Sequence, residues 1–343
     1  MNDAPIEEAP TNDTSTNDAP TSRLARRSFL ARLPLFALPL FALPLGIPLQ
    51  SLPSRGGGAV PPSARTREEQ ERARRDAQDL ARLARNYERR SGGRIGIAIR
   101  GLSPGRMTSW RGHERFLMCS TFKVSLVACI LARCEQGADD LTLRLPFTDE
   151  DIGTLWAPVI RENRETGSLS LAALCAGAIT VSDNVCANLL LRHLCGPRKL
   201  TQFWREEGDR VSRLDACEPA LNHPAADPLA NTTSPCAMTG TLDHLLYGSA
   251  LNTDSKRLLR GWMTHCRTGT SRLRSGFPPG WTCGDKTGSN GKDIAADIAF
   301  ARPVDNGTHR VVISTYTAGG AASPALLDAT FREIGALATR RIA

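Results

Sequence analysis

The spacing of apolar and polar residues predicts a helix near each end of the folded part of the chain. Over residues 66–90, the apolar side chains of Leu80, Leu83 and Ala84 share one helical face among arginines and glutamates, and a Ser-Gly-Gly triplet then ends the helix. A second helix is predicted over residues 323–341, because Ser323 is a favourable N-cap residue ahead of an amphipathic stretch.

Alternation of apolar and polar residues predicts five strands, two before and three after a long helical stretch. The first two cover residues 94–99 and 107–111 and form a hairpin. The other three cover residues 280–285, 294–301 and 310–317, each separated from the next by turn residues.

Helical periodicity dominates between residues 116 and 266, with loops rich in Gly, Pro and Asp. The order helix, strands, helical insert, strands, helix indicates one sheet covered by the terminal helices and a separate helical lobe, with a cleft between them. We expect a sheet domain made of residues 65–116 and 265–343 and an all-helical domain made of residues 117–264.

The first 64 residues are expected to lie outside the fold. Residues 1–22 are rich in Asn, Asp, Thr and Pro and lack periodicity, which indicates a disordered leader. Arg26 and Arg27 then precede an apolar run (33–49) that its four prolines make a poor membrane-spanning helix. Such a pair is typical of a twin-arginine export signal, although an arginine-rich chain can contain one by chance. We therefore expect export to the periplasm, a cleaved signal and no membrane anchor in the mature protein.

Composition narrows the classes of function. The 343 residues are 41% hydrophobic and carry a net charge of +8, which is too apolar and too weakly charged for a wholly disordered chain. The positive charge is spread along the chain without a nucleic-acid-binding motif, so we expect no nucleic-acid partner. The ten cysteines include no Cys-x-x-Cys pair and the six histidines are scattered, which argues against zinc and a dense disulfide framework. We expect no metal, no cofactor and a monomer.

The first candidate catalytic motif is Ser120-Thr121-Phe122-Lys123. Its spacing puts Ser120 and Lys123 on one helical face, where a lysine kept neutral by burial or nearby cations can accept the serine proton. The match is weak by itself, because Ser289-Asn290-Gly291-Lys292 also fits Ser-x-x-Lys and looks like a turn.

Two further motifs give the first one weight. Ser182-Asp183-Asn184 opens a predicted helix, and Lys286-Thr287-Gly288 follows the predicted strand 280–285. Each has a simple structural explanation, an N-cap for the former and a strand-ending turn for the latter. Together and in this order, however, the three motifs form the set found in penicillin-binding proteins and class A β-lactamases.

Over residues 66–341 the chain resembles a class A serine β-lactamase. Residues 213–222, Arg-Leu-Asp-Ala-Cys-Glu-Pro-Ala-Leu-Asn, are similar to the family's omega loop, where a glutamate and an asparagine hold the deacylating water. Further matches are Ile179-Thr180-Val181, Asn188-Leu189-Leu190-Leu191 and Gly280-Trp281. The resemblance implies an α+β fold with a five-stranded antiparallel sheet flanked by the N- and C-terminal helices, plus an all-helical domain.

The resemblance also implies hydrolysis of a small-molecule β-lactam, a penicillin or a cephalosporin, and hence antibiotic resistance. Ser120 would attack the lactam carbonyl, while Lys123, or Glu218 acting through a water, takes its proton. Backbone N–H groups of Ser120 and Ser289 would form the oxyanion hole. Ser182 would relay a proton to the departing ring nitrogen.

The same resemblance assigns the groups that bind the substrate. Lys286, Thr287 and Ser289 are expected to bind the carboxylate beside the ring nitrogen. Asn184 is expected to donate to the side-chain amide, and Asn222 to position the water for deacylation. The other expected substrate-binding residues are Gly288, Trp156 as gatekeeper of the cleft, and Arg272 as a second cation for the carboxylate.

Two departures from the family's pattern concern charged residues. Ala216 and Asn231 stand where many members have an Arg and an Asp that pair across the omega loop, so the stability of this loop must have another source. Ala295 stands where many members have an arginine for the substrate carboxylate. Arg272 stands where other members supply that charge, with a plain surface arginine as the alternative.

Two more residues have competing interpretations. Cys119 matches a carbapenem-hydrolysing subgroup, but Asn290 replaces the cysteine with which it would pair, so we do not predict carbapenemase activity. Trp156 can be a core tryptophan instead of a gatekeeper.

Three other functions share part of this motif set. A D-alanyl-D-alanine carboxypeptidase or transpeptidase lacks the deacylating glutamate, whereas this chain has Glu218-Pro219 followed by Asn222. A β-lactam sensor that stays acylated needs a membrane anchor or signalling partner. A glutaminase-like member of the wider serine–lysine fold also lacks the glutamate loop. Hydrolysis is therefore the favoured prediction.

The export signal can be tested by changing Arg26→Lys together with Arg27→Lys. We expect the precursor to stay in the cytoplasm, because the arginine pair directs it to the twin-arginine route. Cell fractionation with an activity assay measures this, and undiminished periplasmic activity would point to the general secretory route.

Overall fold

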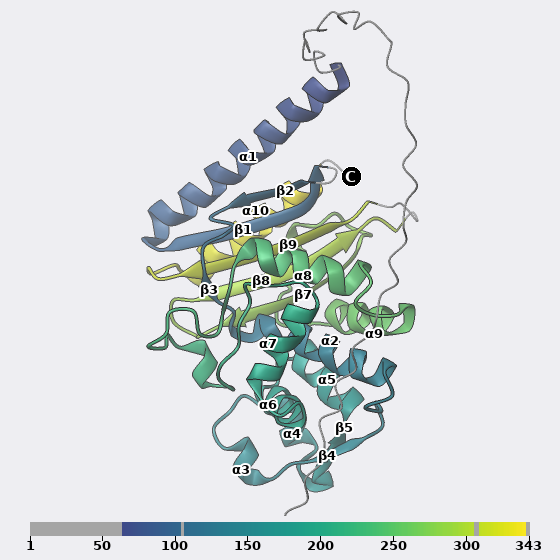
Figure 1. Ribbon diagram of the computed structural model, residues 1–343. Coiled ribbons are helices and arrows are strands. Elements are labelled where there is room, and N and C mark those ends of the chain that lie inside the picture. Colours follow the sequence, from purple (N-terminus) through teal and green to yellow (C-terminus); the bar gives the residue numbers. More distant parts are fainter. Residues whose placement is uncertain (1–63, 104–105, 305–308, 341–343) are drawn as a thin grey trace, which may run out of the picture. The chain divides into compact units, whose positions relative to one another are not determined.

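The structure, a computed structural model, describes residues 64–103, 106–304 and 309–340 (Figure 1). The predicted leader, the arginine pair and most of the linker lie outside the described residues. Within the described ranges, no helix is both long enough and apolar enough to cross a membrane.

A five-stranded antiparallel sheet lies at the centre of the described chain, in the order β2-β1-β9-β8-β7. Its strands are β1 (Arg94–Ser103), β2 (Arg106–Trp110), β7 (Thr282–Ser289), β8 (Ala295–Arg302) and β9 (Val311–Ala318). Each overlaps a strand expected from the alternation of the sequence, and the predicted α+β fold is confirmed.

One predicted boundary is wrong, because Lys286-Thr287-Gly288 lies inside β7 and not after it. β7 pairs with β8 without interruption as far as Ser289 opposite Ala295. A Cβ atom on residue 288 would lie 2.9 Å from Met118 O and 3.1 Å from Ser120 N. Glycine is therefore required here by the close approach of β7 to the segment around Ser120, and not by a turn.

Two long helices, α1 (Ala64–Ser91) and α10 (Pro324–Thr339), cover one face of the sheet (Figure 1). Both were predicted, and Ser323 caps α10 as expected. Leu80 and Ala84 of α1 are fully buried and share a core with alternate residues of β1 and β9. The amphipathic pattern of the N-terminal helix thus faces the sheet.

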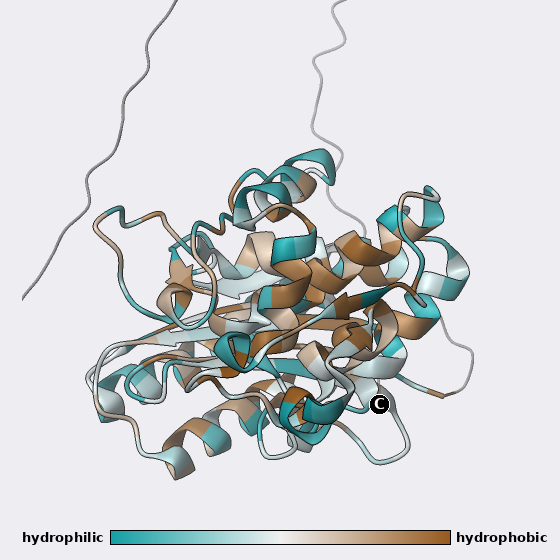
Figure 2. Ribbon diagram, turned by 90° about the horizontal axis from the view of Figure 1, so that it is seen from below, coloured by the Kyte–Doolittle hydropathy of each residue, from teal (hydrophilic) through white to brown (hydrophobic). Residues whose placement is uncertain are grey.

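Helices cover the opposite face as well. α8 (Pro235–Tyr247) packs on β1 and β9, and α9 (Thr253–Thr264) packs on β7. Figure 2 shows the hydrophobic residues gathered on the inner helices and the hydrophilic ones on the outer turns. Both helices belong to the range 117–264 that was proposed as an all-helical domain, and both also pack on the sheet. The boundaries of that domain therefore stay a prediction.

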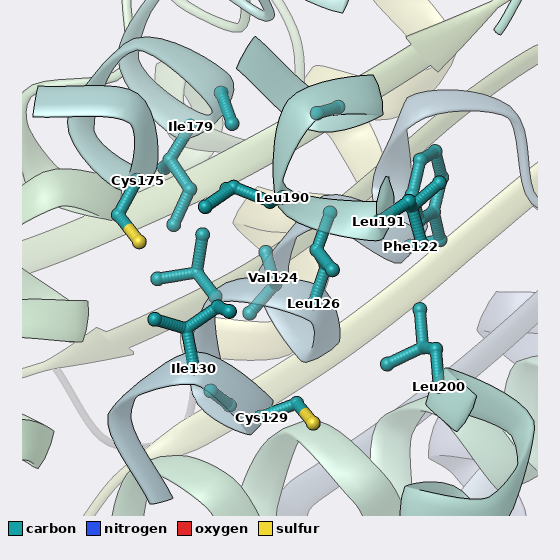
Figure 3. Close-up of a cluster of buried hydrophobic side chains, with 14 of the residues drawn as sticks. Phe122, Val124, Leu126, Cys129, Ile130, Cys175, Ile179, Leu190, Leu191 and Leu200 are labelled. Carbon is teal, nitrogen blue, oxygen red and sulfur yellow. The ribbon is translucent and has the colours of Figure 1, made fainter. Parts of the chain in front are cut away.

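The centre of the helical layer is α2 (Phe122–Glu135), which is buried from Phe122 to Leu131. Figure 3 shows its side chains among those of neighbouring helices, including Ile179, Leu190 and Leu200. The helices that pack on α2 are α5 (Leu171–Thr180), α6 (Asn184–His193), α7 (Pro197–Glu206), α8 and α9. The shorter helices α3 (Asp149–Ile152) and α4 (Pro158–Glu162) lie between β4 and β5 in the chain. A helix buried on all sides is apolar throughout, so the single lysine in this stretch of α2 needs a specific partner.

Four short strands lie within the region predicted as helical. β3 (Phe116–Leu117) pairs with β6 (Thr232–Thr233), and β4 (Arg144–Pro146) pairs with β5 (Ser168–Ser170). Strands of two or three residues are too short to produce a recognisable period of two.

Candidate active site

Ser120 lies at a bend in the chain just before α2. It is the middle residue of the 3-10 helix η1 (Cys119–Thr121), and Cys119 has a left-handed φ of 44°. Lys123 follows in the first turn of α2. The structure therefore places the serine and the lysine at the start of a helix that is buried.

The ammonium group of Lys123 is fully buried and surrounded by acceptors. Its Nζ donates to Asn184 Oδ1 at 2.7 Å and to Ser182 O at 3.0 Å, and it lies 3.4 Å from Ser182 Oγ. It also forms an ion pair of 3.1 Å with Glu218 Oε1. These contacts satisfy a charge that burial would otherwise disfavour.

The Glu218 carboxylate is equally buried and is the point where the candidate groups meet. Its Oε1 accepts a hydrogen bond from Ser120 Oγ at 3.1 Å, and its Oε2 accepts one from Asn222 Nδ2 at 2.5 Å. Asn222 Oδ1 is also buried, and none of the described residues donates to it. An acceptor for the serine hydrogen and a free amide oxygen thus lie side by side.

Asn188 of α6 holds the backbone of Glu218, a role that the sequence did not reveal. Asn188 Nδ2 donates to Glu218 O at 3.0 Å, and Glu218 N donates to Asn188 Oδ1 at 2.9 Å. The signal available was the match over Asn188-Leu189-Leu190-Leu191, which does not say which side chain faces the loop.

Ser182 lies between the two candidate lysines. Its Oγ accepts a hydrogen bond from Lys286 Nζ at 2.9 Å and lies 3.4 Å from Lys123 Nζ. Its φ of 59° is left-handed, which is uncommon for a non-glycine residue and costs about 1–3 kcal/mol.

Asp183, the next residue, fixes this strained conformation. Its carboxylate is fully buried and accepts hydrogen bonds from Cys186 N at 2.8 Å, Val159 N at 2.9 Å and Ile160 N at 3.2 Å. It therefore caps α6 and ties α4 to the same loop. The N-cap explanation of the Ser-Asp-Asn motif is correct for its aspartate, and it coexists with the placement of Ser182 beside both lysines.

Lys286 brings a second buried ammonium group to the site from β7. Its Nζ donates to Ser182 Oγ and to Thr287 O, the latter at 2.7 Å. Burial, with a contribution from the neighbouring Lys123, lowers the pKa of Lys286 to about 8. Its positive charge is therefore sensitive to a mildly alkaline solution.

A cavity of about 500 Å³ opens beside the end of β7. Its lining includes Thr268, Arg272, Ser289 and Ala295. Thr268 Oγ1 lies 2.6 Å from Thr287 Oγ1, a contact that the motifs did not predict. Ser289, at the end of β7, and Arg272 thus border one concave surface. Its lining does not include Ser120, Lys123 or Glu218.

Arg272 is not a freely solvated surface arginine. Its side chain is 18% exposed, and its Nη1 donates to Ala296 O at 3.0 Å. Arg272 and the small side chain of Ala295, at the start of β8, line the same cavity.

Trp156 is 62% exposed, which excludes the alternative of a core tryptophan. Its Nε1 donates to Val181 O at 2.9 Å, and its backbone oxygen accepts from Asn184 N at 2.8 Å. The ring is therefore fixed next to the Ser-Asp-Asn segment while one of its faces remains accessible.

Asn231 holds the base of the omega loop (residues 213–222) from a later position in the chain. Its Oδ1 accepts hydrogen bonds from Asp215 N at 2.9 Å and Ala216 N at 3.0 Å, while its backbone oxygen accepts from Met118 N at 3.0 Å. It is 2% exposed and has a left-handed φ of 57°, a conformation that asparagine tolerates well. A neutral amide thus joins the start of the loop to the segment before Ser120.

All ten cysteines lie within the described residues, and all are free thiols. Burial, with the nearby Glu218 carboxylate, raises the pKa of Cys119 to about 12, which keeps this thiol protonated. Among the residues that the structure describes, no group of His, Cys, Asp and Glu side chains is arranged to hold a metal ion.

Comparisons with known proteins agree with this geometry. The chain matches the Beta-lactamase enzyme family over residues 76–342. It is 39% identical over 251 residues to beta-lactamase L2 of Stenotrophomonas maltophilia, covering 73% of this chain and 82% of the relative. It is 36% identical over 232 residues to beta-lactamase OXY-1 of Klebsiella oxytoca, covering 68% and 79%.

Solved structures extend the likeness to the fold. An ancestral class A beta-lactamase superposes with a TM-score of 0.72 at 41% identity, over 78% of this chain and 99% of that structure. A beta lactamase from Xanthomonas campestris gives a TM-score of 0.73 at 36% identity, over 78% and 99%. The chain therefore belongs to the beta-lactamase enzyme family, among its class A serine members.

The hydrogen bonds that Asn231 Oδ1 accepts at the base of the omega loop can be tested with Asn231→Ala. Two backbone N–H groups lose their acceptor, so we expect the free energy of unfolding to fall by about 1–3 kcal/mol, measured by urea denaturation. Asn231→Asp is the matched control, because it keeps an oxygen acceptor at this position. The double variant Asn231→Asp with Ala216→Arg adds the positive partner that a buried carboxylate needs. Wild-type stability of the alanine variant would contradict a clasp at this position.

Proposed function

We propose that this protein hydrolyses β-lactam antibiotics through an acyl-enzyme on Ser120 and thereby confers resistance to them. The observation that carries the proposal is the Glu218 Oε1 atom, which lies 3.1 Å from both Ser120 Oγ and Lys123 Nζ. A nucleophile, an acceptor for its proton and a buried cation thus form one connected group.

In acylation, Ser120 Oγ attacks the lactam carbonyl carbon and the ring C–N bond breaks. The proton of Ser120 can pass to Glu218, which accepts a hydrogen bond from the serine hydroxyl, or to Lys123 in its neutral form. Lys123 lies 3.1 Å from the same carboxylate oxygen, so both candidate proton acceptors are part of one connected group.

Two backbone N–H groups, those of Ser120 and Ser289, are proposed to stabilise the oxyanion. The absence of a side chain at Gly288 supports this, because it lets β7 run against the backbone of Ser120. Ser182 is proposed to pass a proton to the departing ring nitrogen. Its hydroxyl lies 2.9 Å from Lys286 Nζ, a group that can replace that proton.

The carboxylate that penicillins and cephalosporins carry beside the ring nitrogen is proposed to bind to Lys286, Thr287, Ser289 and Arg272. The two cations lie on either side of the end of β7, one beside Ser182 and one at the cavity. Charge-assisted hydrogen bonds of this kind are about twice as strong as neutral ones. Asn184 is proposed to donate to the substrate's side-chain amide, and Trp156 to border the cleft.

Deacylation requires a water held near the ester carbon. Asn222 Nδ2 donates a hydrogen bond to Glu218 Oε2. The buried Oδ1 of Asn222 accepts none from the described residues and is free to accept one from a water. A water that donates to both this oxygen and Glu218 would be oriented and deprotonated by the same pair. This arrangement favours hydrolysis over a carboxypeptidase or transpeptidase, which has no such glutamate.

We further propose that the protein acts in the periplasm as a monomer after twin-arginine export. Support for this route comes from Arg26-Arg27 and the proline-rich apolar run that follows them. No metal or cofactor is needed for the steps above.

Glu218→Gln tests the division between acylation and deacylation. The amide is nearly isosteric but cannot accept the proton, so deacylation should slow by about a hundred- to ten-thousand-fold while Ser120 still reacts. Mass spectrometry after brief mixing with a penicillin should show one penicillin mass on Ser120, and Ser120→Ala is the control that should remain unlabelled. Wild-type turnover of the glutamine variant would place the base elsewhere, and an unlabelled variant would mean that Glu218 also controls acylation.

The lowered pKa of Lys286 predicts the alkaline limit of activity. Below a pH of about 8 the ammonium is charged, and above it the charge and the attraction for the substrate carboxylate are lost, so kcat/KM should fall. Lys286→Arg keeps a permanent charge, and its profile should lack this inflection even if its activity is lower. An unchanged inflection in the arginine variant would assign it to another group.

A further inference from the structure

Arg272 stands directly before a short 3-10 helix, η4 (Leu273–Gly276), which is pressed against α10. A Cβ atom on residue 335 of α10 would lie 2.2 Å from Leu273 O, so Gly335 is what allows this contact. Arg272 is the N-cap residue of the turn, but its side chain makes no capping bond. The N–H at the start of η4 therefore needs an acceptor from elsewhere.

That acceptor is Asp297 of β8, which is fully buried. Leu273 N donates to Asp297 Oδ2 at 3.1 Å. The preceding residue of the same strand, Ala296, accepts from Arg272 Nη1 at 3.0 Å. Two consecutive residues of β8 thus hold both the backbone after Arg272 and its guanidinium.

We propose that Asp297 is a positioning residue for substrate binding: by capping η4, it aims Arg272 at the cavity beside Ser289. The inference rests on the proposed function, in which Arg272 binds the substrate carboxylate. Asp297 is on the same face of β8 as Ala299 and Ala301, which belong to the core under α1 and α10. It is fully buried and does not line the cavity, so it acts through Arg272 and not on the substrate itself.

The capping role needs an acceptor and not a charge. Asp285, Arg272 and Lys286 are the charged groups whose fields act on Asp297. Burial and the neighbouring Asp285 raise the pKa of Asp297, which favours its neutral form. A neutral carboxyl and a carboxamide offer the same carbonyl acceptor, so asparagine should replace this aspartate.

The test compares two isosteric variants, Asp297→Leu and Asp297→Asn. We expect leucine, which removes the acceptor, to raise KM for a penicillin by about tenfold with kcat changed by less than about twofold, and asparagine to behave like the wild type. Thr315→Val is the matched control, because it removes a buried hydroxyl from the neighbouring strand on the same face without touching the cap. Should the leucine variant fail to fold, Asp297→Thr keeps a strand-forming residue with a shorter side chain.

Two further comparisons separate positioning from a general structural effect. The methyl ester of the same penicillin lacks the carboxylate charge, so its KM should not respond to Asp297→Leu. In an Arg272→Ala background, which should itself raise KM by about ten- to a hundredfold, adding Asp297→Leu should cause no further rise.

The outcomes distinguish this inference from the proposed function. If Arg272→Ala raises KM but Asp297→Leu does not, the inference is wrong and the function stands. An equal effect on the methyl ester, or an additive effect in the double variant, would also overturn it in favour of a structural role. If Arg272→Ala leaves KM unchanged in an enzyme that hydrolyses penicillin, both the proposed role of Arg272 and the inference about Asp297 are wrong. If the wild-type protein does not hydrolyse penicillin, the proposed function itself is wrong.

Discussion

The buried ion pair between Lys123 and Glu218 is the constraint on which the rest of the site depends. Neither side chain is exposed, and the charged atoms lie 3.1 Å apart. Taking two ions out of water costs several kcal/mol each, and their attraction offsets this only if the remaining hydrogen-bonding groups are satisfied. Ser182 and Asn184 satisfy the lysine, and Ser120 and Asn222 satisfy the carboxylate. Helices α2 and α6 and the omega loop must therefore meet at one point.

The same constraint determines how the sheet joins the helices. Lys286 comes from β7 and shares the hydroxyl of Ser182 with Lys123, so two cations approach each other at a single oxygen. Burial, with a smaller contribution from Lys123, lowers the pKa of Lys286, and a substrate carboxylate would restore a favourable balance of charge. β7 can come this close to η1 because residue 288 has no side chain. The distance between β7 and the backbone of Ser120 is thus set by Gly288, the smallest residue of the Lys-Thr-Gly motif.

Much of the fold could be predicted from the sequence, since its signals are local. The N-cap at Ser323 and the alternation in β1, β8 and β9 need information from only a few neighbouring residues. The order of the three motifs indicated the family, but not the contacts between them. Asn188 and Glu218 are 30 residues apart, and Leu273 and Asp297 are 24 apart, so no local pattern marks either pair. The prediction that Gly288 lies after the strand was wrong, because the constraint on this residue, the backbone of Ser120, lies far away in the sequence.

The two departures from the family's charged residues follow one physical rule. At the base of the omega loop, Asn231 keeps the acceptor geometry while both charges are absent, so no unpaired ion is buried there. Beside the cavity, Ala295 carries no charge, and the guanidinium of Arg272 borders the same cavity from a different element. A charge that only tied the loop together can be replaced by a neutral amide, because hydrogen bonds alone satisfy the backbone. A charge proposed to meet an anionic substrate cannot be replaced in this way and has to be supplied from another position. In each case we expect the interaction to be retained while the residue that supplies it changes.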